Sequence, residues 1–432
     1  MENLDQIYQA FKDAGSFVIT DTRKISKKGG LFFSLSGPNF NGNEFAKKAI
    51  DAGCTFAIVD DDNYVLDERT LLVEDCLQSL QQLASHHRQQ FDIPIIAITG
   101  SNGKTTTKEL LYACFSSKWK THSTTGNLNN HIGVPLTLLG LNDTHEAAII
   151  EMGTNNPGEI ADLARIADPT DAVVTSIGKA HLEGLGSIEG VAQEKLSLFD
   201  YVRTKGGQLF CNVSSSFVQD YINRYPESHH TSYTEKGASS IDINLEKVFP
   251  RLKCRINDKW NVDSALFGKH NLLNISAALT TSTTLGLEPN DCINAINRLS
   301  LDNNRTQTIE KDTTTFYLDA YNANPTSMSA AIQAFAESKH QHKWLILGDM
   351  FELGQNEIAE HQSIVEIIKS FDWEKVILVG KLFGQTELDD ELSYFENTTD
   401  AVDWFKTQQL DDKEILIKAS RSMKLETLLD GV

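Results

Sequence analysis

The apolar residues of this chain occur in short runs separated by polar segments of helical length, which is the pattern of an α/β protein. Three strand-like runs open the chain: Phe17-Val18-Ile19, Leu31-Phe32-Phe33 and Phe56–Val59. A polar helical segment lies at 45–50, and leucines at positions 77, 80 and 83 recur at helical spacing. Pro94 then interrupts the helical pattern. We predict a small N-terminal α/β domain over residues 1–84.

A second series of apolar strands follows, each separated from the next by a segment long enough for a crossover helix. Its members are Ile95–Ile98, Ala147–Met152, Ala172–Ile177 and Gln208–Val213. Strands joined by long crossovers pair in parallel. The pattern therefore predicts a central domain over residues 85–300, built on a mostly parallel sheet.

A third strand series begins after a polar loop near residue 300. It consists of Phe316–Leu318, Trp344–Leu347, Val376–Val379 and Ile415–Ile417. This series predicts a Rossmann-like C-terminal domain over residues 301–432. Three domains also suit the length of 432 residues, because single cores stop growing at roughly 250–300 residues.

Charge and composition narrow the possible functions. A formal net charge of -20 disfavours general binding to nucleic acid or to anionic membranes, which depends on clustered Lys and Arg. The N-terminus lacks the features of a signal peptide, and no apolar run is long enough to span a bilayer. We therefore expect a cytoplasmic protein with free thiols. Its cysteines are scattered singly: Cys54, Cys76, Cys114, Cys211, Cys254 and Cys292.

The segment Ile95–Thr106 places an apolar strand, a glycine-bearing turn and a Lys-Thr pair directly before a helix, which is typical of a phosphate-binding loop. Gly100 and Gly103 let backbone N–H groups approach phosphates, Lys104 neutralises charge, and the Thr105 hydroxyl can bind magnesium. On the following helix, the periodicity predicts an outward-facing Lys108. The alternative is a plain strand-to-helix turn carrying a solvated lysine.

Three further residues are candidates for a metal site. Glu151 ends a buried strand, at the sheet edge where open α/β proteins bind ligands, and a carboxylate there suits magnesium. His181 follows the next strand, although a lone histidine is more often an ordinary packed or surface residue. Lys195 lies on a predicted helix, where the spacing alone indicates only a solvated side chain.

Several motifs taken together resemble the Mur ligase family, and the resemblance runs from the N-terminal domain to about the last twenty residues. The matching segments are Thr99–Thr105, Ser123–Asn130, Gly268–Asn274, Tyr321–Met328, Leu347–Gly354 and Lys418–Met423. The last three are similar to the member that adds D-alanyl-D-alanine. The chain departs from the usual family residues at Thr22, Asn41, Asn43, Ser197 and Leu318.

The resemblance implies a role for each matching residue. The ATP phosphates would contact Gly100, Ser101, Asn102, Gly103, Lys104, Thr105 and Thr106, and the adenine would contact Asn271 and Asn274. Arg305 and Asp319 would contact the γ-phosphate and the ribose. Magnesium ligands would be Thr105, Glu151, His181 and Lys195, the last as a carbamate formed with carbon dioxide. Substrate contacts would come from Thr22, Arg23, Ser34, Asn41, Thr125, Asn127, Asn129, Asn322 and Asn324.

The implied activity is ATP-dependent ligation of D-alanyl-D-alanine to UDP-N-acetylmuramoyl-tripeptide, through an acyl phosphate. Lys104, Lys195, His181 and Arg305 would be its catalytic residues, and the N-terminal domain would bind the UDP-sugar. Another Mur-type amide ligase, a P-loop ATPase or kinase, and a non-catalytic protein that binds a nucleotide sugar are the alternatives. The sequence leaves open whether the third peptide residue is diaminopimelate or lysine.

Overall fold

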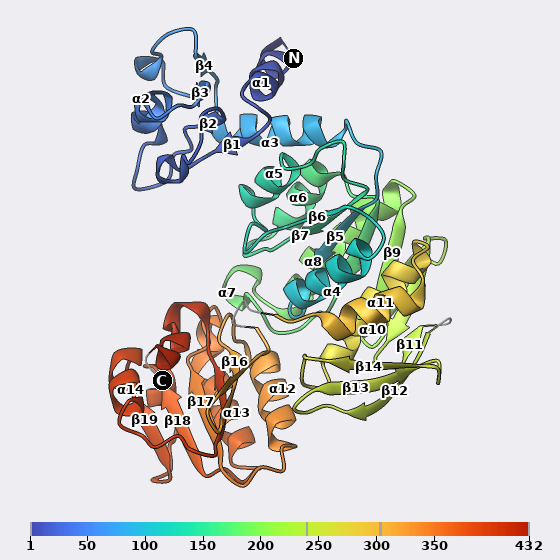
Figure 1. The fold of residues 1–432 in the computed structure, drawn as a ribbon, viewed down its shortest axis with the longest axis vertical. Helices are drawn as coiled ribbons and strands as arrows, with labels where there is room; N and C mark the ends of the chain where they lie inside the picture. The colour runs from blue at the N-terminus through green and yellow to red at the C-terminus, as the bar shows by residue number, and fades with distance from the viewer. Residues whose placement is uncertain (1, 239–240, 302–304, 431–432) are drawn as a thin grey trace.

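Three α/β domains follow one another along an arc, with the N-terminal and C-terminal domains at its two ends (Figure 1). The computed structural model describes residues 2–238, 241–301 and 305–430. Each domain contains one sheet, as the three series of apolar runs predict.

The N-terminal domain is a four-stranded parallel sheet in the order β1-β2-β3-β4. Its elements are α1 (Glu2–Asp13), β1 (Val18–Ile19), η1 (Thr22–Lys24), β2 (Leu31–Phe33), η2 (Gly42–Phe45), α2 (Ala46–Asp51), β3 (Phe56–Val59), η3 (Asp62–Tyr64), β4 (Thr70–Leu72) and α3 (Cys76–Arg88). The three predicted strands are confirmed, whereas α1 and β4 were not predicted. The expected boundary at 84/85 falls inside α3. At the end of α3, Arg88 donates hydrogen bonds to the carbonyl oxygens of Ala167 and Asp168, which ties this helix to the central domain.

The central domain contains a ten-stranded sheet in the order β14-β13-β12-β11-β10-β9-β8-β5-β7-β6. Its strands are β5 (Ile95–Thr99), β6 (Thr121–Ser123), β7 (Ala147–Glu151), β8 (Asp171–Val174), β9 (Gln208–Asn212), β10 (His230–Thr234), β11 (Gly237–Ala238), β12 (Ile241–Lys247), β13 (Leu252–Ile256) and β14 (Trp260–Ser264). From β6 to β10 every pairing is parallel, as predicted.

The prediction of a mostly parallel central sheet was wrong for its other half, because β10 to β14 pair antiparallel. These strands alternate between buried and exposed positions, and β12 is buried only at Ile241 and Ile243. One-sided strands of this kind contain no continuous apolar run, so the search for such runs missed them.

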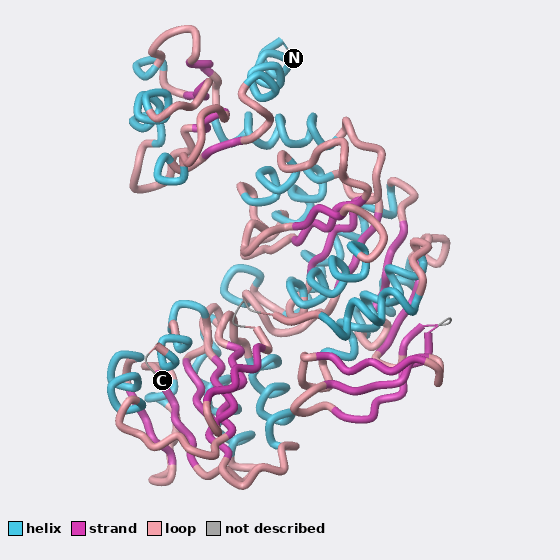
Figure 2. The backbone as a smooth tube through the Cα atoms, viewed as in Figure 1, coloured by secondary structure: helices cyan, strands magenta, loops and turns pink. Residues whose placement is uncertain are grey.

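Helices cover both faces of the parallel half (Figure 2). They are α4 (Lys104–Ser116), α5 (Gly133–Leu138), α6 (Glu159–Ala167), α7 (Leu182–Leu185), α8 (Ile188–Thr204), α9 (Ser216–Arg224), α10 (Asn271–Thr284) and α11 (Pro289–Arg298). Ile96 and Ile98 pack on the side of α4, α10 and α11, while Ala97 and Ile150 pack on the side of α6 and α8. The side chains of β5 and β7 are buried on both faces of the sheet. The candidate functional site lies at the edge of the sheet where these two strands end.

The C-terminal domain contains a six-stranded sheet in the order β15-β16-β20-β17-β18-β19, parallel except for the β15 edge. Its elements are β15 (Gln307–Lys311), β16 (Thr314–Asp319), α12 (Pro325–Ala336), β17 (Lys343–Gly348), η4 (Gly354–Asn356), α13 (Glu357–Ile368), β18 (Lys375–Val379), η5 (Phe383–Gln385), β19 (Leu392–Phe395), α14 (Thr398–Phe405), β20 (Glu414–Lys418), η6 (Arg421–Met423) and η7 (Leu425–Leu429). The four predicted strands are confirmed. Among the described helices, none is both long and apolar enough to cross a membrane.

Candidate functional site

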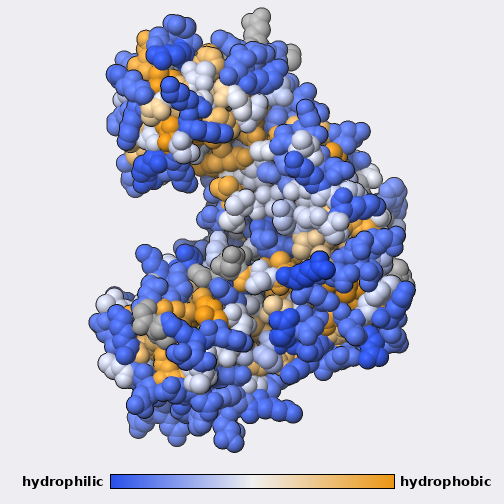
Figure 3. Space-filling model, viewed as in Figure 1, coloured by the Kyte–Doolittle hydropathy of each residue, from blue (hydrophilic) through white to orange (hydrophobic). Residues whose placement is uncertain are grey.

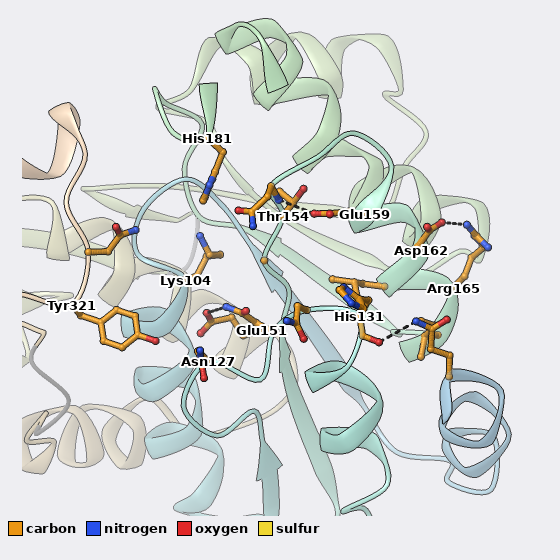
Figure 4. A pocket seen from close by; sticks show the side chains of 18 of the residues that line it. Lys104, Asn127, His131, Glu151, Thr154, Glu159, Asp162, Arg165, His181 and Tyr321 are labelled. Atoms are coloured by element: carbon orange, nitrogen blue, oxygen red, sulfur yellow. Dashed lines mark hydrogen bonds and ion pairs between the residues drawn. The ribbon is translucent and has the colours of Figure 1, made fainter. Parts of the chain in front are cut away.

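Two adjoining cavities lie where the ends of β5 and β7 approach the C-terminal domain. The larger has a volume of about 450 Å³ and brings together seven predicted site residues: Lys104, Asn127, Asn129, Glu151, His181, Arg305 and Asn322 (Figure 4). The smaller, about 90 Å³, is lined by Ser101, Asn102, Gly103, Lys104, Thr105, Thr106, Asn271, Asn274, Arg305, Asp319 and Asn322. Three residues line both cavities: Lys104, Arg305 and Asn322. Residues that lie far apart in the sequence therefore form one continuous site.

The predicted phosphate loop connects β5 to the N-terminus of α4. Gly103 has a φ of +82°, and a Cβ there would lie 2.3 Å from Oδ1 of Asn274, so the close approach of α10 excludes a side chain. The amine of Lys104 donates to the carbonyl oxygen of Gly100 at 2.6 Å. Burial lowers the pKa of Lys104, and the negative charge of Glu151 partly offsets this effect. The loop thus presents a helix N-terminus and a cation to the same cavity, as phosphate binding requires.

Glu151 is 2% exposed and ends β7. Its Oε1 accepts a hydrogen bond from Nδ2 of Asn129 at 2.9 Å, while its Oε2 has no hydrogen-bond partner among the described residues. A buried carboxylate oxygen without a partner is costly unless a cation or a donor meets it. The site therefore fits a magnesium ion, which binds proteins through one or two carboxylates and otherwise through water and phosphate. The described residues contain no group of three His, Cys, Asp or Glu side chains able to hold a metal.

Lys195 on α8 is 0% exposed, so the alternative of a solvated lysine was wrong. Its amine has no hydrogen-bond partner among the described residues. Burial holds the pKa of Lys195 well below its usual value, and the positive charge of Lys104 adds to the effect. A neutral amine is the form that reacts with carbon dioxide, so the environment of Lys195 fits a carbamate.

His181 precedes α7 and lies at the boundary with the C-terminal domain. Its Nδ1 lies 2.6 Å from Oε2 of Glu352, and this ion-pair contact holds the pKa of Glu352 below its usual value. His181 also lines a further cavity of about 340 Å³ together with Glu183 and Glu352. Sequence reasoning missed Glu352, although it lies in one of the quoted motifs, because nothing in the sequence indicates which residue it faces.

The residues expected around the base and the ribose belong to two hydrogen-bonded groups. Nδ2 of Asn274 donates to Oδ1 of Asn271 at 2.8 Å, and Nδ2 of Asn271 donates to the carbonyl oxygen of Phe267 at 2.7 Å. The Lys418 amine donates to Oδ2 of Asp319 at 2.5 Å. Although burial opposes it, the charge of Lys418 holds the pKa of Asp319 below its usual value. Lys418 is buried and lines the smaller cavity, and it was not among the predicted site residues.

Arg305 approaches the site from the C-terminal domain. Its guanidinium carbon lies 3.9 Å from the centroid of the Tyr321 ring, within the range of a cation–π contact. Tyr321 lines the larger cavity and was also missed by sequence reasoning. The aromatic face orients a cation that would otherwise be free to rotate in the cavity.

Six predicted substrate residues line neither cavity. Thr22, Arg23, Ser34 and Asn41 belong to the N-terminal domain, Thr125 lines a separate surface pocket, and Asn324 caps α12. Asn324 nevertheless contacts the phosphate loop, because its Nδ2 donates to Oδ1 of Asn102 at 2.7 Å.

The prediction that Lys108 faces outward was wrong. This residue is 2% exposed, and its amine donates to the carbonyl oxygen of Thr124 at 2.7 Å. Helical periodicity describes the direction of the Cα–Cβ bond, whereas a long side chain can reach a buried acceptor beside the helix.

Fold and site together define a three-domain enzyme of the nucleotide-using class, with a phosphate loop that faces a buried carboxylate at a domain boundary. Comparison with known families agrees: residues 98–282 match the Mur ligase middle domain, and residues 304–421 match the Mur ligase, glutamate ligase domain.

The chain is similar to several curated ligases over nearly its whole length. It is 34% identical to the UDP-N-acetylmuramoyl-tripeptide–D-alanyl-D-alanine ligase of Bacillus subtilis, over 95% of this chain and 92% of the relative. It is 32% identical to the enzyme of the same name from Escherichia coli, over 95% and 92%. A crystal structure of MurF from Acinetobacter baumannii superimposes with a TM-score of 0.86 at 28% identity, over 98% of this chain and 97% of that one. The chain belongs to the Mur ligase family.

Proposed function

We propose that this protein uses ATP to ligate D-alanyl-D-alanine to UDP-N-acetylmuramoyl-tripeptide, a step of peptidoglycan precursor synthesis. Relatives that bear this activity in their names match nearly the whole chain. The proposal is supported above all by one cavity, which is lined by Lys104, by the buried carboxylate Glu151 and by Arg305 from the C-terminal domain.

The reaction has two steps. The terminal carboxylate of the tripeptide attacks the γ-phosphorus of ATP, and the bond to the bridging oxygen breaks to leave ADP and an acyl phosphate. The amine of the dipeptide then attacks the acyl carbon and loses a proton, and inorganic phosphate departs as the amide forms. Lys104 and Arg305 stabilise the charge on the transferring phosphoryl group, which is the main protein contribution to such transfers.

The remaining residues bind and orient the substrates. Asn271 and Asn274 contact the adenine and Asp319 contacts the ribose, while the N-terminal domain holds the UDP-sugar through Thr22, Arg23, Ser34 and Asn41. Thr125, Asn127, Asn129, Asn322 and Asn324 orient the peptide substrates. Thr105, Glu151 and His181 would hold magnesium, which would neutralise charge on the phosphates when bound. We place the enzyme in the cytoplasm, and the six free, buried cysteines support a reducing compartment.

Phosphate release distinguishes this function from its rivals. With ATP and the UDP-muramoyl tripeptide present, we expect sustained phosphate release only after D-alanyl-D-alanine is added. Release that ignores the dipeptide would indicate an ATPase or kinase, and release driven instead by a single amino acid would indicate another Mur-type ligase. Substrates ending in diaminopimelate and in lysine, compared in single turnovers, identify the third peptide residue.

We further propose that Lys195 acts as a carbamate that helps to hold magnesium. Lys195→Ala should then lose most of the ligase activity, and acetate or formate should restore part of it by occupying the place of the carbamate. Lys195→Arg, which keeps the positive charge, should stay inactive because an arginine cannot become an anion. A fully active Lys195→Arg enzyme would show that a cation, and not a carbamate, is needed at this position.

A further inference from the structure

His181 is a predicted metal ligand that touches the C-terminal domain. Its Nδ1 lies 2.6 Å from Oε2 of Glu352, and its ring points toward Lys104 in the larger cavity (Figure 4). A carboxylate this close to Nδ1 favours the tautomer with the proton on Nδ1, so that Nε2 carries the lone pair. Nε2 is thus the nitrogen that remains for a metal ion.

The backbone on both sides of this contact adopts an uncommon conformation. His181 has a φ of 53° and Glu352 a φ of 65°, both in the left-handed region that non-glycine residues seldom occupy. Such conformations persist where the surrounding structure requires them, and they gather at functional sites. Here the two strained residues are the two partners of one ion pair.

Neighbouring contacts hold the same two segments together. Lys179, two residues before the histidine, pairs with Glu360 of α13. A Cβ on Gly354 would lie 3.6 Å from the Cα of Glu183, so the two backbones are in close contact. The contact between His181 and Glu352 is therefore one of several contacts between the central and C-terminal domains.

We propose that Glu352 is a positioning residue for metal binding, a carboxylate that the C-terminal domain contributes to hold His181 in its metal-binding tautomer and orientation. The inference rests on the proposed role of His181 as a magnesium ligand. It has a consequence for the whole enzyme: if the metal binds better when Glu352 is in contact, then the metal in turn favours the position of the C-terminal domain that makes this contact.

The test measures metal binding and not only activity. The affinity for Mn²⁺ is determined by electron paramagnetic resonance on the full-length protein saturated with ADP, with a protein-free titration of ADP as the blank. Because residues that orient a ligand typically change metal affinity by about 10- to 100-fold, Glu352→Ala should weaken Mn²⁺ binding by about tenfold or more. Glu352→Gln, which keeps an acceptor oxygen but no charge, should weaken it less. The affinity for ADP without metal should stay unchanged in both.

Two further variants make the result specific. Glu360→Ala breaks the neighbouring ion pair with Lys179 but does not touch His181, so it should bind Mn²⁺ as tightly as the wild type. His181→Ala should weaken binding at least as much as Glu352→Ala. If His181→Ala binds Mn²⁺ weakly and Glu352→Ala binds it as tightly as the wild type, the proposed role of Glu352 is overturned, while His181 remains a metal ligand. Wild-type Mn²⁺ binding by both variants would show that His181 is not a metal ligand. The proposed ligation reaction would still be tested separately, by measuring dipeptide-dependent phosphate release.

Discussion

Two lysine side chains near the phosphate loop are held in surroundings that disfavour a positive charge. Burial lowers the pKa of both Lys104 and Lys195, and the charge of Lys104 lowers that of Lys195 further. For Lys104 this cost is recovered when the phosphates of ATP bring negative charge to the site, whereas the same burial keeps Lys195 available for the proposed carbamate. The site therefore favours the binding of a ligand with several negative charges.

Lys104→Ala should abolish ligation and leave the fold intact. The amine lines both cavities, and removing one group that stabilises transition-state charge costs on the order of 10²- to 10³-fold in rate. Ligation rate and circular dichroism should be compared with those of Lys48→Ala, an exposed lysine on α2. Wild-type activity in Lys104→Ala would refute the phosphate-loop assignment.

Lys195→Met should stabilise the protein in the absence of nucleotide and carbon dioxide, because methionine fills the same space without a buried amine. The sign follows from the lowered pKa of Lys195. Below the ordinary lysine pKa the unfolded chain takes up a proton that the folded protein resists, so the wild type loses stability as the pH falls toward the lowered folded-state value. Denaturant unfolding at pH 7 and pH 10 should show the larger difference between variant and wild type at pH 7. If the variant and the wild type were equally stable at pH 7 and also at pH 10, the amine of Lys195 would be protonated and solvated in the native protein.

Much of the site was predicted from residue type and position, since phosphate loops and strand-end carboxylates have local signatures. Four residues that gather at the cavities illustrate this: Gly103, Lys104, Thr105 and Glu151. Ser101, Asn102, Thr106 and Asn274, which also line the cavities, were expected only from the resemblance to the family. Glu352, Tyr321 and Lys418 were missed because their roles depend on partners brought near only by the tertiary fold. No periodicity in the sequence encodes such a pairing.

At the scale of elements, the turn between β5 and α4 depends on how closely α10 approaches it. Gly103 begins α4 with a positive φ, and Asn274 occupies the space that a side chain would need. The same helix supplies Asn271 and Asn274 to the smaller cavity. The position of α10 thus sets both the shape of the phosphate loop and the site for the base.

Gly103→Ala should lose nucleotide affinity as well as stability. The natural control is Gly158→Ala, since Gly158 also begins a helix at a positive φ, of +89°, but a Cβ there would meet nothing within 4 Å. The control should show only the conformational cost of a left-handed alanine, roughly 1–2 kcal/mol of unfolding free energy. ADP binding by calorimetry should fall in Gly103→Ala and remain at the wild-type level in Gly158→Ala. Similar binding by the two variants would mean that contact with α10 does not shape the loop.

The elements themselves were predicted unevenly, for a physical reason. Strands such as β5 and β7 are buried on both faces and therefore appear as continuous apolar runs. By contrast, β12 and β14 have one exposed face and polar residues at alternate positions, and β4 is only three residues long. Short or one-sided strands are stabilised by their neighbours, which the local sequence does not reveal.

At the scale of the whole molecule, the proposed substrate residues are divided between two separated surfaces. A notch separates the N-terminal domain from the C-terminal domain (Figure 3). Thr22, Arg23, Ser34 and Asn41 lie in the N-terminal domain and line neither cavity beside Lys104. A UDP-muramoyl peptide that reaches from one surface to the other must cross the notch. An acyl phosphate also has to be protected from water, which favours closure of the domains around it.

We therefore expect the radius of gyration, measured by small-angle X-ray scattering, to decrease when a non-hydrolysable ATP analogue and the UDP-muramoyl tripeptide are both bound, and to change less with the analogue alone. Arg23→Ala should reduce the response to the tripeptide, because the guanidinium that pairs with Asp21 is 84% exposed and can turn toward a diphosphate. Arg69→Ala is the matched control: Arg69 forms the same kind of pair with Asp67 two residues away, in the same domain, and is not a proposed substrate contact. Its compaction should equal that of the wild type. An unchanged radius of gyration with both ligands bound to the wild type would mean that the substrate spans the notch without domain closure. An equally reduced compaction in Arg23→Ala and Arg69→Ala would mean that general charge, and not a specific contact, draws the domains together.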